Sequence, residues 1–149
     1  MKTNLSVNDV ARYILALKKS GSKKTQTVNF DSFTQFDTVL RDFNQNSEIA
    51  QRKISFAVLN ATNTFGVASF GGRVARNAGG YVIATENASE IMDYSFIIAD
   101  NPQSPAVLFL KDFFGIQKVY SKGLAPLKDP AIYRADITLV LGLDILDKY

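Results

Sequence analysis

Residues 137–145, close to the end of the sequence, place the strongest constraint on the fold. The odd positions of this segment are all large aliphatic residues, whereas the even positions mix Thr, Val, Gly and Asp. Successive side chains of a β-strand point to opposite faces of a sheet, so this period of two is typical of a half-buried strand. We therefore expect a β-sheet with this strand at its centre.

Two amphipathic helices are expected before the sheet. A capping box at Ser6 and Asp9 begins the first helix, in which Val7 and Leu17 belong to one apolar stripe. The second helix is predicted over residues 32–43, where Phe, Val and Leu recur at helical spacing. A stripe of this kind is what a helix needs to pack on a sheet.

From residue 53 onward the sequence is typical of short strands. The expected strands cover residues 54–59, 64–70, 81–85, 94–99 and 116–120. The apolar run 104–110 is ambiguous, because Pro105 also suits the first position of a helix, and we interpret it as a strand.

The expected fold class is α+β, with two N-terminal helices on a mainly antiparallel sheet. The 149 residues are enough for one domain with a sizeable core, and no linker divides them. Residues 1–46 would form the helical part of this single domain and residues 53–149 the β-rich part.

The composition excludes several chemistries. The chain contains no Cys, His or Trp, which removes thiol catalysis, Cys/His zinc sites and Ser-His-Asp triads. We expect neither a cofactor nor a metal, and we do not expect an enzyme. A remaining enzymatic alternative would use Glu86, Glu90 and Asp93 on one helical face.

Residues 65–81 form the most distinctive segment, in which two Gly-Gly pairs bracket two arginines. We interpret it as a flexible cationic loop that becomes ordered against a neighbouring subunit, although a plain surface hairpin explains it equally well. Arginines on one copy would reach carboxylates on another. The predicted interface residues are Phe70, Arg73, Arg76, Tyr81, Glu86 and Glu90.

A nucleic-acid-binding function is the alternative. Clustered cations on a flexible segment gain affinity for phosphates through counterion release. The residues concerned are Lys18, Lys19, Lys23, Lys24, Arg73 and Arg76. A solvated helix end explains the lysines at least as well, and the net charge of +3 is small.

No apolar run reaches the roughly 18–20 residues of a membrane span, and the first residues do not have the pattern of a signal peptide. We therefore expect a protein without membrane contact.

Two segments resemble parts of the virion structural proteins of bacteriophages and other small viruses. Residues 70–81 look like an inter-subunit arm, and residues 129–136, which lead into 137–145, look like the closing strand of a capsid-type domain. This resemblance implies a self-assembling capsid, decoration or connector protein, located in the virion or the host cytoplasm. Its partners would be further copies of the chain and other virion proteins.

Overall fold

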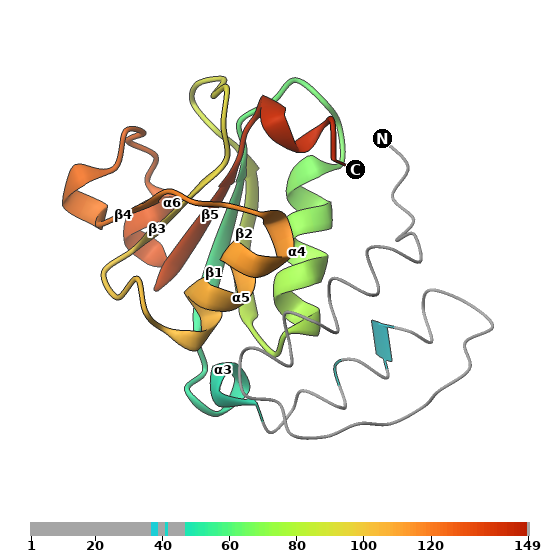
Figure 1. Ribbon diagram of the computed structural model, residues 1–149, viewed down its shortest axis with the longest axis vertical. Helices are drawn as coiled ribbons and strands as arrows, with labels where there is room; N and C mark the ends of the chain where they lie inside the picture. Colours follow the sequence, from blue (N-terminus) through green and yellow to red (C-terminus); the bar gives the residue numbers. More distant parts are fainter. Residues whose placement is uncertain (1–36, 39–40, 42–46, 149) are drawn as a thin grey trace.

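The computed structural model describes residues 37, 38, 41 and 47–148 (Figure 1). The elements are α3 (Glu48–Gln51), β1 (Ser55–Asn60), α4 (Val67–Asn77), β2 (Tyr81–Asn87), β3 (Phe96–Ala99), α5 (Pro105–Phe114), β4 (Val119–Tyr120), η1 (Lys122–Leu124), α6 (Ala131–Arg134), β5 (Ile137–Leu141) and η2 (Leu143–Ile145). Asp37, Thr38 and Arg41 are helical, in the range predicted for the second helix. The first predicted helix and the rest of the second lie outside the described residues.

The strands form one five-stranded sheet in the order β2-β1-β5-β3-β4. Strand β5 lies at the centre, as expected, and residues 143–145 continue as a 3-10 turn. The expectation of a half-buried strand was wrong, because apolar clusters cover both faces of the sheet and all five residues of β5 are buried. β5 runs parallel to β1 and antiparallel to β3. The strands predicted at 54–59, 81–85 and 94–99 are confirmed, with small differences at their ends. Of the strand predicted at 116–120, only Val119 and Tyr120 form β4.

The sheet is mixed, so the expectation of a mainly antiparallel sheet was wrong. β1 and β2 are parallel with α4 between them in the chain, and β3 and β4 are parallel with α5 between them. Parallel neighbours need a crossover, which a helix usually supplies. Two βαβ units therefore flank the central strand β5, and the fold is an α+β domain with a mixed sheet.

Helix α4 replaces both the strand predicted at 64–70 and the cationic loop predicted at 65–81. Val67, Phe70 and Val74 occur at helical spacing and are buried against the sheet. Gly71 lies within the helix, where an added Cβ atom would be 2.8 Å from Cγ1 of Val58 and 2.9 Å from Cδ1 of Leu141. The glycine thus permits close packing of the helix on β1 and β5.

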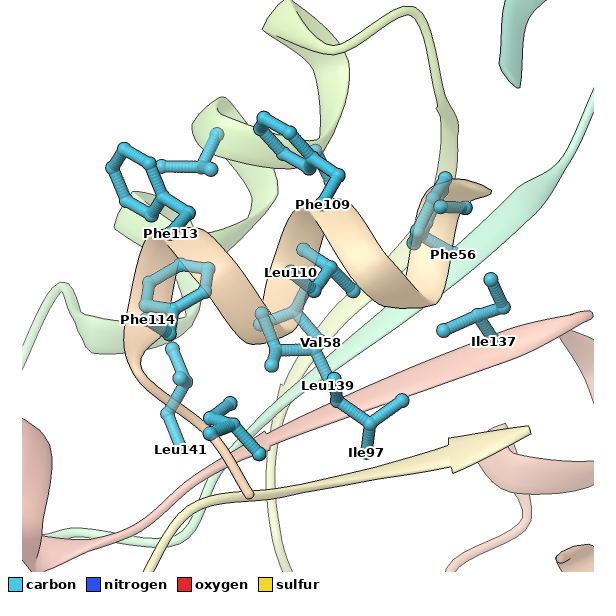
Figure 2. Close-up of a cluster of buried hydrophobic side chains, with 14 of the residues drawn as sticks. Phe56, Val58, Ile97, Phe109, Leu110, Phe113, Phe114, Ile137, Leu139 and Leu141 are labelled. Atoms are coloured by element: carbon cyan, nitrogen blue, oxygen red, sulfur yellow. The ribbon is translucent and has the colours of Figure 1, made fainter. Parts of the chain in front are cut away.

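Helix α5 corrects the strand predicted at 104–110. The Ser104 side chain accepts a hydrogen bond from the N–H of Val107, Pro105 occupies the first turn and Gly115 ends the helix with φ +68°. Figure 2 shows Phe109, Phe113 and Phe114 of this helix in the cluster that also contains sheet residues. All three rings are essentially buried, and burial of each ring contributes about 1.5–3 kcal/mol.

The opposite face of the sheet carries a smaller apolar layer. Ala131 and Ile132 of α6 are buried there against residues such as Leu59, Phe96 and Val140. Helices α4 and α5 therefore cover one face of the sheet, and α6 with its flanking loops covers the other (Figure 1).

Three serine–aspartate pairs fix loops to the ends of the sheet. In each pair, one carboxylate oxygen accepts hydrogen bonds from both the backbone N–H and the hydroxyl of the serine. The pairs are Ser55–Asp136, Ser89–Asp129 and Ser95–Asp144. The first is reciprocal, because the Asp136 N–H also donates to the Ser55 hydroxyl at 2.9 Å.

We predict that Asp136→Asn lowers the free energy of unfolding at pH 7 by about 1 kcal/mol, a modest value because the side chain is exposed and screened by solvent. The Ser55 hydroxyl and N–H lower the pKa of Asp136 in the folded state. The carboxylate therefore contributes stability above its unfolded pKa of about 3.9, and this contribution is lost as the pH falls through the lower folded pKa.

Urea denaturation at pH 7 and at pH 2.5 would test this prediction, with Asp147→Asn at another exposed aspartate as the control. The difference between wild type and Asp136→Asn should shrink at pH 2.5. An equal difference at both pH values would contradict the assigned role of the charge.

Candidate functional site

A polar groove of about 790 Å³ lies at the carboxyl ends of β1 and β2. Its volume is in the range of small-ligand sites, and the carboxyl ends of parallel strands are where such sites form in sheets of this kind. Three segments meet there: the β1–α4 loop, the first turn of α4 and the end of β2 with the loop that follows. The lining residues are Asn60, Thr62, Asn63, Thr64, Phe65, Gly66, Ala68, Ser69, Thr85, Glu86, Asn87, Ala88, Ser89, Glu90 and Ile91.

Asn60, the last residue of β1, organises the floor of the groove. Its Nδ2 donates to the carbonyl oxygen of Thr64 at 3.0 Å and to Oδ1 of Asn87 at 3.3 Å. Its Oδ1 accepts from the N–H of Thr62 at 3.0 Å and from the Thr62 hydroxyl at 2.7 Å. This one buried side chain therefore shapes the β1–α4 loop and joins it to the end of β2.

Phe65 and Gly66 form the rim of the groove where the loop enters α4. Gly66 has φ +89°, a left-handed conformation that favours glycine, and no side chain caps the helix. The backbone N–H groups of the first helical turn are therefore left without an intrahelical acceptor at the groove. Phe65 is 98% exposed, which is exceptional for an aromatic side chain beside a cavity.

The electrostatic character of the groove is neutral to acidic. Among the described residues of the lining, Glu86 and Glu90 are the only ionisable ones, and none is a lysine or an arginine. Arg134 of α6 donates to Oε1 of Glu86 at 3.0 Å and balances that charge. The remaining polar groups are uncharged amides, hydroxyls and backbone groups.

The predicted interface residues around α4 lie in different environments. Phe70 is 7% exposed and packs against the rings of Phe113 and Phe114, so its expected position on a projecting loop was wrong. Arg73 pairs with Asp37 of the same chain, with Nε 2.6 Å from Oδ2. Arg76 and Tyr81 are exposed, as the interface prediction requires.

The acidic residues singled out by the sequence are partly brought together. Glu86 and Glu90 line the same groove, whereas Asp93 does not. The helix that the enzymatic alternative would need over residues 86–93 is not formed, because Glu86 lies in β2, which ends at Asn87, and residues 88–95 form a loop. The lysines of the nucleic-acid alternative, Lys18, Lys19, Lys23 and Lys24, lie outside the described residues.

A tyrosine pair forms a separate titratable cluster. A hydrogen bond from Tyr120 and the charge of Lys118 lower the pKa of Tyr94, and the same hydrogen bond with partial burial raises the pKa of Tyr120. Nζ of Lys118 lies 3.7 Å from the centre of the Tyr94 ring. None of the three residues lines the polar groove.

Sequence reasoning missed the central residues of the groove. Asn60 and Asn87 end two different strands, and Thr62 and Phe65 lie in the loop after the first of them. Only the parallel pairing of β1 and β2 brings these residues together. The helical spacing of Val67, Phe70 and Val74 was the signal that could have shown the crossover.

The described part of the chain lacks two features, a membrane-spanning helix and a metal-binding cluster. It contains no helix long and apolar enough to cross a membrane. It also contains no group of three or more His, Cys, Asp or Glu residues placed to hold a metal ion.

Comparison with families of known proteins, with curated proteins and with solved structures finds no match to this chain. Its function therefore has to be inferred from its own geometry.

We predict that Asn60→Ala lowers the free energy of unfolding by about 2 kcal/mol, because it leaves buried donors of the β1–α4 loop without their acceptor. Asn63→Ala is the matched control, since Asn63 is exposed in the same loop. Chemical denaturation of the two variants would measure the difference. Equal stabilities would contradict the role assigned to Asn60.

Proposed function

We propose that this protein acts by binding a small polar ligand in the groove at the carboxyl ends of β1 and β2, without chemical turnover. One observation carries the proposal: three segments of the chain converge on a cavity of ligand size, and a buried side chain, Asn60, fixes the shape of its floor. A preformed cavity lowers the entropic cost of binding.

The environment of the carboxylates supports binding over catalysis. Carboxylates that transfer protons are usually buried or placed beside a like charge. Glu86 is instead exposed and paired with Arg134, and Glu90 is exposed at the rim. Both residues are better suited to contact a ligand than to transfer a proton.

A screen of small neutral, cationic and anionic compounds, followed by amide chemical shifts, would test groove binding. We predict that hits shift the amides of the lining residues. Ser69→Trp should abolish these shifts, because Ser69 is an exposed lining residue of α4 and the indole would obstruct the groove.

Arg76→Trp is the matched control, as Arg76 is exposed two turns further along the same helix and outside the groove. Groove amides that respond to no compound would contradict the proposed function. Hits that survive Ser69→Trp would contradict it as well.

A second candidate is self-association of the kind that the resemblance to virion structural proteins implies. It is favoured by the exposed edge of β2, which among the described elements pairs only with β1. Tyr81 and Ile83 are apolar side chains exposed on this strand, at 68% and 38%. An unprotected edge strand with apolar residues can pair with another chain.

We predict that self-association, measured by light scattering after size-exclusion chromatography over a range of concentrations, is abolished by Ile83→Lys, since a charge on an edge strand opposes pairing. Leu108→Lys is the matched control, because Leu108 of α5 has the same 38% exposure. A monomeric wild-type protein at every concentration would contradict this candidate.

A further inference from the structure

We infer that the ligand of the polar groove is an uncharged saccharide whose ring stacks on Phe65 and whose hydroxyl groups bond to the groove. The inference rests on the proposed binding function and specifies its ligand class. It follows from three properties of the groove: the sign of its charge, its uncharged hydrogen-bonding groups and the exposed aromatic ring at its rim.

The charge of the groove disfavours anionic ligands. Sites for phosphates and nucleotides normally place lysine or arginine next to the anion. The part of the lining that the structure describes contains neither lysine nor arginine, and it contains two carboxylates. Among the described lining groups, the first-turn N–H groups of α4 would attract a phosphate, but the carboxylate of Glu90 opposes it and no cationic side chain adds to the attraction.

The same groups give little affinity for a cationic ligand. The charge of Glu86 is already balanced by Arg134, at 3.0 Å. Glu90 is exposed at the rim, where an ion pair contributes at most a small part of a binding energy. An uncharged ligand is thus the best match to the electrostatics of the groove.

The hydrogen-bonding groups of the lining match hydroxyl groups. A sugar hydroxyl both donates and accepts, and the side chains of Asn63, Ser69, Thr85 and Asn87 offer both functions. Asn87 uses Oδ1 to accept from Asn60, which fixes its amide and leaves the N–H₂ group as a donor. The lining can therefore bond several hydroxyls of one ring without leaving a charge unpaired.

Phe65 supplies the apolar contact that a sugar ring requires. The face of an aromatic ring is negative, and the C–H groups on one face of a pyranose are polarised by their neighbouring oxygens, so the two surfaces attract. At 98% exposure, Phe65 contributes almost nothing to the core of the free protein. A ring placed in solvent beside a polar cavity gains its contacts only when a ligand is bound.

Titration of the full chain with chitotriose, cellotriose and maltotriose, followed by amide chemical shifts and calorimetry, would test the inference. We expect at least one trisaccharide to shift groove amides. Phe65→Ala should weaken its binding about tenfold or more, and Phe65→Trp should retain it. Tyr133→Ala is the control, because Tyr133 is also an exposed aromatic residue, at 64%, but lies outside the groove.

Inorganic phosphate and trilysine in the same assay distinguish a failure of the saccharide inference from a failure of the proposed binding function. If either shifts the groove amides and no trisaccharide does, the saccharide inference is overturned while groove binding stands. A trisaccharide that binds outside the groove, or that binds Phe65→Ala unchanged, also overturns the inference. If no probe or screened compound reaches the groove, the proposed function itself fails.

Discussion

The close approach of α4 to the sheet is the contact on which the rest of the structure depends. At Gly71 the helix lies so near β1 and β5 that a single added carbon would be 2.8 Å from Val58 and 2.9 Å from Leu141. This packing holds α4 as the crossover between β1 and β2, and the two strands can therefore pair in parallel. The N-terminal turn of the helix then lies beside the carboxyl ends of both strands, and this arrangement creates the groove.

The hydrogen bonds that shape the groove also stabilise the fold. Asn60 satisfies the backbone of the loop that leads into α4, and its amide also joins β1 to Asn87 at the end of β2. A buried polar side chain with all its groups bonded is rigid, because each lost bond would leave an unpaired donor or acceptor. Thr138, on the central strand, shows the contrast: its hydroxyl is buried, and among the described residues it has no hydrogen-bond partner. Among the described residues, the buried side chain of Asn60 at the groove is therefore fully hydrogen-bonded, whereas the buried hydroxyl of Thr138 at the centre of the sheet is not.

The sequence predicts the strands better than the way they pair. Residues 137–141 alternate so regularly that the central strand could be placed from the sequence alone. The helix at residues 67–77 was missed despite its helical spacing, because glycines that permit close packing on a sheet look the same in sequence as glycines of a flexible loop. The apolar residues 106–110 fit a strand and a helix equally well, and the cap at Ser104 decides the outcome. With both crossover helices predicted as strands or loops, neighbouring strands were expected to pair antiparallel. The sequence then provided no reason to expect the residues of the groove to lie close together.

Strand β2 takes part in both the proposed ligand binding and the proposed self-association, and the two interactions do not exclude each other. Tyr81 and Ile83 lie at its beginning, whereas Glu86 and Asn87 line the groove at its end. With a rise of about 3.3 Å per residue, Tyr81 lies about 13 Å from Thr85, the first residue of the strand that lines the groove. A ligand in the groove would thus leave the first residues of the edge accessible, and a paired edge would leave the groove open.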